Sequence, residues 1–198
     1  FHNTPACVTA INQEELEVTA EIESTALFGE DLVMRRKISL SKTGGKLHLE
    51  DTLINRGTKT ENYCLLYHIN FGYPMLDEGV EIEADMTDVI PRTPISSEKI
   101  GERETFIAPI DNEEERCYFL KNKGDSVAVI NRNLGVKAKV SYSKDTLPCL
   151  IQWNSPSSKD YALGIEPATS FLDNDFCYKQ IDPKGEVVFQ VCLDFSQV

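Results

Sequence analysis

The sequence contains no apolar run close to the roughly 20 residues that a transmembrane helix requires. Hydrophobic residues make up 41% of the 198-residue chain and charged residues 26%, proportions that are typical of a soluble globular protein. No secretory signal peptide is recognisable at the start, which is Phe1. We therefore expect neither a membrane span nor a membrane partner.

Basic residues are few relative to acidic ones. The chain has 20 Lys and Arg residues against 32 Asp and Glu residues, which gives a formal net charge of −12. Such a chain repels the phosphate groups of nucleic acids and the surfaces of anionic membranes. A neutral small molecule meets no such barrier, so we expect a small-molecule partner and no nucleic acid.

Closely spaced cysteine pairs are also absent. The chain has six cysteines without any C-x-x-C motif. Disulfide frameworks belong mainly to small secreted domains, and several of these cysteines lie in apolar runs, where a free thiol packs as a small hydrophobic group. We expect six reduced thiols and a cytoplasmic protein.

Motifs for metal, nucleotide or nucleophilic chemistry are missing too. The three histidines, His2, His48 and His68, have none of the spacings that mark a local zinc site. His48 alternates with leucines, which indicates the polar face of a strand. No G-x-S-x-G elbow and no glycine-rich phosphate loop occurs. The sequence thus predicts no metal site and no cofactor.

Alternation of apolar and polar residues with a period of two dominates the chain. It is clear in EELEVTAEIE, in SVAVINRNLGVKAKVSYS and in the final GEVVFQVCLDF. Gly44 and Gly45 join two further runs of this kind, which predicts a hairpin. Many strands with little helical periodicity indicate a single all-β domain over residues 1–198, either a sandwich or a barrel.

Residues 91–116 interrupt this pattern. They contain three prolines and no sustained period, so we expect a long loop over the sheet. Arg92 within it is a candidate ligand for a hydroxyl or carboxylate group, with an ordinary surface residue as the alternative. The acidic residues Glu113, Glu114 and Glu115 are interpreted as a solvated surface.

Two predicted strands place polar groups on one face. In LLYHINFGYP, His68 and Asn70 share a face because successive strand residues point to opposite sides. In YALGIEP, Glu166 shares a face with Ala162 and Gly164, two small residues that leave space for a ligand. A satisfied polar patch and an exposed strand end are the alternative interpretations.

The segment LPCLIQWN holds the only tryptophan, Trp153. Gln152 and Asn154 lie next to it on the opposite face of the predicted strand. An aromatic ring can pack on the C–H groups of a sugar while side-chain amides bind its hydroxyls. The segment therefore suits sugar binding, with simple core packing of the indole as the alternative.

Taken in order, LLYHINFGYPMLDEG, PRTP, LPCLIQWN and YALGIEPAT resemble the aldose 1-epimerase-like, uncharacterised branch of the galactose mutarotase-like superfamily. The resemblance implies an all-β galactose mutarotase-like β-supersandwich with a sugar on its concave face, and it implies that this chain lacks the N-terminal part of such proteins. His68 matches the general acid that acts on the ring oxygen in mutarotases, and Glu166 matches the general base that acts on the anomeric hydroxyl. His2 fits a further histidine of these proteins, but the glycine and arginine beside that histidine are missing here.

Our leading hypothesis is an isomerase of the aldose 1-epimerase type that interconverts sugar anomers by general acid–base catalysis through Glu166 and His68. The residues expected to bind the sugar are His2, Asn70, Arg92, Gln152 and Trp153. A sugar-binding module without turnover is the first alternative, and a metal-dependent β-barrel isomerase of the cupin type is the second. The sequence leaves a homo-oligomer open.

Overall fold

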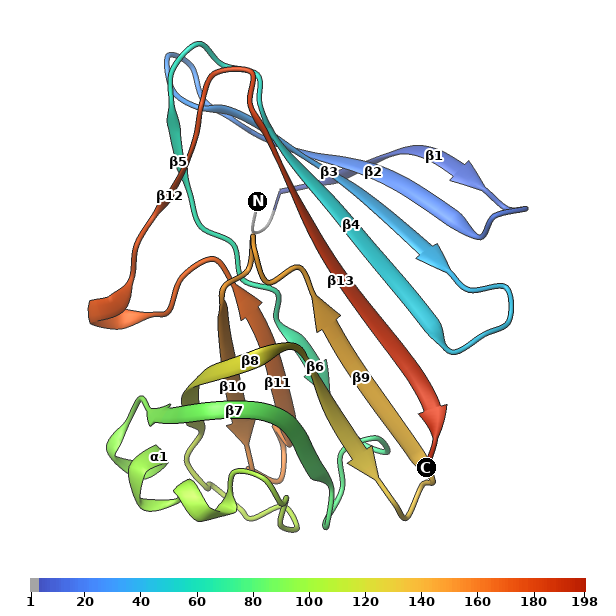
Figure 1. Cartoon of the computed structure of the whole chain (residues 1–198), viewed down its shortest axis with the longest axis vertical. Coiled ribbons are helices and arrows are strands. Elements are labelled where there is room, and N and C mark those ends of the chain that lie inside the picture. Colours follow the sequence, from blue (N-terminus) through green and yellow to red (C-terminus); the bar gives the residue numbers. More distant parts are fainter. Residues whose placement is uncertain (1–3) are drawn as a thin grey trace. The chain divides into compact units, whose positions relative to one another are not determined.

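The computed structural model describes residues 4–198, which form two compact units. Unit 1 comprises the residues up to 64 together with 177–194, and unit 2 comprises residues 65–176 together with 195–198. The regular structure of each unit consists mainly of antiparallel strands, as the alternating sequence pattern predicts (Figure 1). The all-β fold class is thereby confirmed.

Unit 1 contains a run of five neighbouring antiparallel strands, seen in blue, cyan and red in Figure 1. In their order across the sheet they are β1 (Ala6–Asn12), β2 (Glu17–Thr25), β3 (Asp31–Leu40), β4 (Lys46–Asn55) and β13 (Glu186–Gln197). A separate two-stranded sheet pairs β5 (Glu61–Tyr63) with β12 (Lys179–Ile181). The predicted hairpin joins β3 to β4, and both Gly44 and Gly45 have the positive φ that favours glycine.

Unit 2 holds the strands that carry the candidate site. In their order across the sheet they are β9 (Val136–Tyr142), β8 (Arg116–Asn131), β10 (Cys149–Ser155), β11 (Ala162–Ala168) and β6 (Ile69–Phe71), and β7 (Glu81–Pro91) also pairs with β8. Strand β11 is flanked by β10 on one side and by the edge strand β6 on the other. Segments that are far apart in the sequence therefore lie side by side here.

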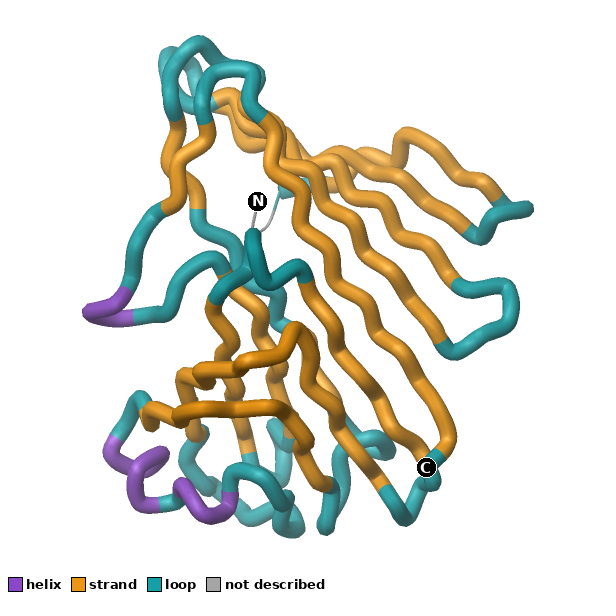
Figure 2. The backbone as a smooth tube through the Cα atoms, in the orientation of Figure 1, coloured by secondary structure: helices purple, strands orange, loops and turns teal. Residues whose placement is uncertain are grey.

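Helix is confined to short pieces, shown in purple in Figure 2. These are α1 (Pro94–Glu98) and two 3-10 turns, η1 (Ile100–Glu102) and η2 (Asp173–Asp175). The first two lie within residues 91–116, which the sequence predicts as a loop. Thr93 explains the difference, because its side chain accepts a hydrogen bond from the Ser96 amide while Pro94 starts the helix, an arrangement that stabilises a first helical turn.

The two faces of the unit 2 sheet differ in character. One face carries a buried cluster of Cys117, Phe119, Ile151 and Ala168, with Trp153 packed against it. The other face is more deeply buried and is formed by residues of the alternate positions, namely Tyr118, Leu120, Leu150, Gln152, Leu163 and Ile165. The alternation predicted for these strands is therefore present in the fold.

Strand β6 is shorter than the predicted run of residues 65–74. Its ladder with β11 pairs Ile69 with Ile165 and ends before Pro167. The Tyr67 amide donates a hydrogen bond to the Pro167 carbonyl, but a proline has no N–H to return one. His68 therefore lies just ahead of the regular strand, beside β11.

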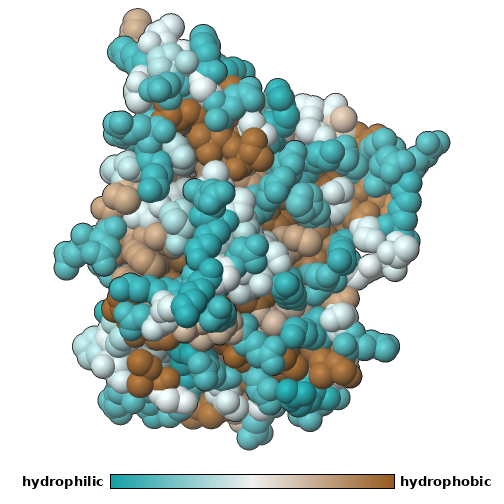
Figure 3. Space-filling view, in the orientation of Figure 1, coloured by the Kyte–Doolittle hydropathy of each residue, from teal (hydrophilic) through white to brown (hydrophobic). Residues whose placement is uncertain are grey.

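The view of the surface in Figure 3 shows mostly hydrophilic residues with apolar groups in separate patches. This distribution fits a chain in which 26% of the residues are charged. Within residues 4–198, no helix has both the length and the apolar character needed to cross a membrane.

Candidate active site

The register of four strands in unit 2 aligns the residues of the candidate site. Cys117 on β8 lies opposite Trp153 on β10, which in turn lies opposite Gly164 on β11. Gly164 is paired with Asn70 on β6. Because residues opposite each other across a sheet point to the same side, the four form one row on the face that also carries Glu166.

Gly164 leaves the space into which Glu166 extends. A Cβ atom at residue 164 would lie 2.5 Å from Glu166 Oε1, 3.2 Å from His68 Cε1 and 3.3 Å from Trp153 Cβ. All three distances are shorter than an ordinary van der Waals contact. The empty side-chain position thus lets the carboxylate, the imidazole and the indole approach one another.

His68 and Glu166 form the chemical centre of the site. Nε2 of His68 lies 3.0 Å from Oε1 of Glu166, and the side chain of His68 is 46% exposed while that of Glu166 is only 5% exposed. Oε1 is buried and has no partner with hydrogen-bond geometry. The carboxylate therefore keeps a lone pair available beside an exposed imidazole.

The pKa of Glu166 is raised, chiefly because burial disfavours its charged form. His68 and Arg92 oppose this shift by attracting the negative charge, whereas the Glu115 carboxylate adds to it. A carboxylate with a raised pKa is a stronger base once it is ionised. The site therefore contains a base that binds a proton more tightly than an exposed glutamate would.

Asn70 contacts the imidazole from the other side. Its Oδ1 lies 2.7 Å from His68 Nδ1, and both side chains are exposed. His68 is thus in contact through both ring nitrogens, with Asn70 at one and Glu166 at the other.

Trp153 lies beside the imidazole, half-buried against the apolar cluster. The two rings are edge-on, with centroids 5.5 Å apart and planes 69° from parallel. The indole Nε1 donates a hydrogen bond of 2.9 Å to Glu115 Oε2. Glu115 therefore holds the indole in place, which differs from the prediction of a purely solvated acidic run. Glu113 also has a partner, Arg116, at 2.7 Å.

Arg92, at the end of β7, is anchored by Asp173 on η2. Its Nε and Nη2 donate hydrogen bonds of 2.6 and 2.7 Å to the two carboxylate oxygens. This contact raises the pKa of Arg92 and lowers that of Asp173. The guanidinium is still near enough to Glu166 to favour its ionised form. Arg92 therefore contributes positive charge to the site from a fixed position.

Gln152 is not brought to this face. It is completely buried on the opposite side of β10, where Oε1 accepts from Arg103 and Nε2 donates to the Arg103 carbonyl and to Asn154 Oδ1. With both amide atoms satisfied, it fixes the segment around Arg103 to the sheet. The structure thus corrects the expectation that Gln152 contacts a sugar beside Trp153. His2 lies outside the residues that the structure describes.

Two contributors to the site, Glu115 and Asp173, are not predicted from the sequence, and Gly164 is predicted only in part. Glu115 and Asp173 lie in irregular segments with no periodicity to indicate their direction. Gly164 was expected only to leave space, and its specific contact with Glu166 depends on the fold.

Among residues 4–198, no group of three or more histidine, cysteine or acidic side chains is placed to hold a metal ion.

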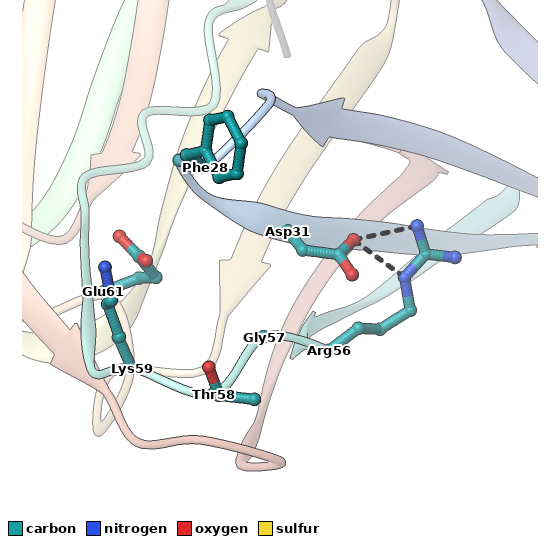
Figure 4. A pocket seen from close by; sticks show the side chains of 8 residues that line it. Phe28, Asp31, Arg56, Gly57, Thr58, Lys59 and Glu61 are labelled. Carbon is teal, nitrogen blue, oxygen red and sulfur yellow. Dashed lines mark hydrogen bonds and ion pairs between the residues drawn. The ribbon is translucent and has the colours of Figure 1, made fainter.

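A separate cavity of about 410 Å³ lies in unit 1, lined in part by Phe28, Asp31, Arg56 and Lys59 (Figure 4). Arg56 donates hydrogen bonds of 3.0 and 2.9 Å to Asp31 and also forms an ion pair with Glu23. Its guanidinium is thus already occupied by carboxylates. The arrangement offers no pairing of an acid with a base comparable to His68 and Glu166.

Residues 1–187 match the model of a family described as Domain of unknown function (DUF4432). The fold matches that of a Klebsiella pneumoniae protein provisionally named an aldose 1-epimerase, with a TM-score of 0.85 and 21% identity, over 90% of this chain and 50% of the other. A galactose mutarotase-like protein from Clostridium acetobutylicum matches with a TM-score of 0.74 and 15% identity, over 99% and 68% of the two chains. No curated protein matches the sequence.

These similarities establish the galactose mutarotase-like fold of the chain, as the sequence resemblance predicts. The chain spans half the length of the Klebsiella protein and about two thirds of the Clostridium protein.

Proposed function

The chain belongs to the DUF4432 family, and on this premise we propose that it binds an aldose sugar and interconverts its two anomers by general acid–base catalysis. The observation that carries the proposal is the pairing of the buried Glu166 carboxylate with the exposed His68 imidazole at 3.0 Å. The names of the two structural neighbours support the same class of reaction.

The reaction needs one base and one acid. Glu166 Oε1 takes the proton of the C1 hydroxyl while His68 Nε2 gives a proton to the ring oxygen. The bond between C1 and the ring oxygen breaks, and the former hydroxyl oxygen becomes the aldehyde oxygen. After rotation about the C1–C2 bond, closure on the other face of the aldehyde reverses both proton transfers.

The proton count is the same before and after each turnover. The pair starts with a proton on His68, holds it on Glu166 while the sugar is open, and returns it on closure. The raised pKa of Glu166 suits this role because it brings the affinity of the base for a proton nearer to that of an imidazole. No further reactant is required.

Two other side chains bind the sugar in this proposal. Trp153 offers an indole edge-on to the imidazole and fixed by Glu115, where it can pack against the C–H groups of a pyranose. Arg92 presents its guanidinium from the end of β7, where remaining N–H groups can donate to hydroxyl oxygens. His2 stays a candidate sugar ligand on the sequence resemblance alone.

The test is anomer exchange measured by polarimetry and by NMR on a panel of neutral aldoses, with binding followed in parallel. Because Trp153 is the only tryptophan, its fluorescence reports on this site alone. We expect at least one sugar to change the fluorescence and to mutarotate faster with the protein than without it. A sugar that binds without faster exchange would instead identify a binding module, and a panel that neither binds nor reacts would contradict both.

A further inference from the structure

We propose that Asn70 is a positioning residue that fixes the tautomer of His68, and not a ligand of the sugar. The carbonyl oxygen of an amide can only accept a hydrogen bond. Since Asn70 Oδ1 lies 2.7 Å from His68 Nδ1, the proton of the neutral imidazole is held on Nδ1. Nε2 is then left as the ring nitrogen that takes and gives the mobile proton.

The contact on the other side of the ring agrees with this assignment. Nε2 lies 3.0 Å from Glu166 Oε1, an atom with no partner in hydrogen-bond geometry, so Nε2 is the ring nitrogen that faces the base. With Nδ1 already protonated, a proton on Nε2 makes the ring cationic and places its charge against the carboxylate. The opposite tautomer would direct the Nδ1 lone pair at the Asn70 oxygen and lose this hydrogen bond.

The strand register explains how Asn70 reaches the ring. Asn70 is paired with Gly164, so no side chain from β11 separates its amide from the imidazole two residues earlier. Asn70 is exposed, which means that its replacement removes little packing. Its contact with His68 is therefore the interaction that a substitution chiefly changes.

This inference rests on the proposed function for its kinetic part only. The substitution Asn70→Leu keeps the side-chain size and removes the acceptor, while Asn70→Asp keeps an acceptor and adds a negative charge. If the proposed reaction occurs, we expect Asn70→Leu to lower kcat by about 10- to 100-fold with little change in KM. Asn70→Asp should retain most of kcat, because it keeps an oxygen that accepts from Nδ1.

The decisive readout is the tautomer itself, observed by long-range ¹H–¹⁵N NMR of the full chain with the His68 signals identified by their loss in His68→Asn. We expect Nδ1–H in the neutral ring of the wild type and in the matched surface control Asn133→Leu, and an increased Nε2–H population in Asn70→Leu. An Nε2–H ring in the wild type, or an unchanged tautomer in Asn70→Leu, would overturn the inference.

These outcomes are separable from the fate of the proposed function. A wild type that turns over no sugar refutes the proposed function, while the NMR comparison still decides the role of Asn70. A rise in KM for Asn70→Leu with an unaltered tautomer would instead assign Asn70 to sugar binding and contradict a positioning role.

Discussion

The Glu166 carboxylate lies where a side chain at Gly164 would have to be. A methyl group on residue 164 would meet Glu166 Oε1 at 2.5 Å, so Gly164→Ala must push the carboxylate away from its position beside His68. The backbone of Gly164 lies within strand β11, and the nearest clashing atom is the end of a side chain. We expect a loss of activity of about tenfold or more with a small change in stability, because catalytic geometry tolerates little displacement.

The matched control for this substitution is Gly72→Ala, since a Cβ atom at residue 72 meets nothing within 4 Å. Anomer exchange and the thermal midpoint should both stay close to the wild type in the control. Equal activity in the two alanine variants would show that the close approach at Gly164 has no part in the reaction.

Removing the positive charge of Arg92 should move the acid limb of the pH profile to higher pH. The Arg92 guanidinium lowers the pKa of Glu166 by favouring its ionised form, so Arg92→Gln raises that pKa further. Glu166 then loses its proton only at higher pH, so kcat/KM rises at a higher pH than in the wild type. The measurement is kcat/KM against pH; a limb that stays in place or moves to lower pH would refute this electrostatic role.

Removing the negative charge of Glu115 should move the acid limb of the pH profile to lower pH. Glu115 raises the pKa of Glu166, so Glu115→Gln lowers it and the acid limb moves to lower pH. The same substitution at the neighbouring exposed residue, Glu114→Gln, serves as the control and should leave the limb nearly unchanged. Shifts of the same sign for Arg92→Gln and Glu115→Gln would contradict the assignment of Glu166 as the titrating base.

Burial of Glu166 should also affect stability in a pH-dependent way. Its folded-state pKa is raised, so the folded protein favours the neutral acid, and this contribution to stability is lost as pH rises through that pKa. Glu166→Gln stays neutral at every pH. Its free energy of unfolding relative to the wild type should therefore increase between about pH 4 and about pH 8 in urea titrations. A relative stability that falls over this interval would show that His68 more than offsets the cost of burying the charge.

Much of the fold could be predicted from alternation alone, because a strand with one buried face shows its period of two directly. The hairpin at Gly44 and Gly45 and the strands around Trp153 and Glu166 are present where the pattern predicts them. The end of β6 could not be predicted, since it depends on the missing N–H of Pro167 in another strand. The short helix α1 has a local sequence signal, because Thr93 can cap it and Pro94 can begin it.

The candidate site was predictable only in part. Alternation correctly placed His68 with Asn70 on one face and Glu166 with Gly164 on another, but the pairing of β6 with β11 that unites them depends on long-range register. The sequence places Gln152 on the face opposite Trp153, but it does not show that this face is the buried one, where Arg103 and Asn154 satisfy the amide. Asp173 and Glu115 act through tertiary contacts from loops, which no local period reveals.

Glu166→Gln provides the most direct test of the proposed catalysis. Glutamine keeps the size of the side chain and its hydrogen bonding but cannot accept a proton at neutral pH, so the sugar should still bind while anomer exchange falls by about 10²- to 10⁴-fold. Glu114→Gln is the control and should exchange the anomers at the wild-type rate. His68→Asn should lower the exchange rate by a factor comparable to that of Glu166→Gln. The double variant should lower the rate by less than the product of the two single factors. The measurement is the exchange rate of the anomers by NMR, at saturating concentration of a sugar that the wild type accelerates. Exchange in Glu166→Gln that equals the wild-type rate, with binding intact, would contradict the role of Glu166 as the catalytic base.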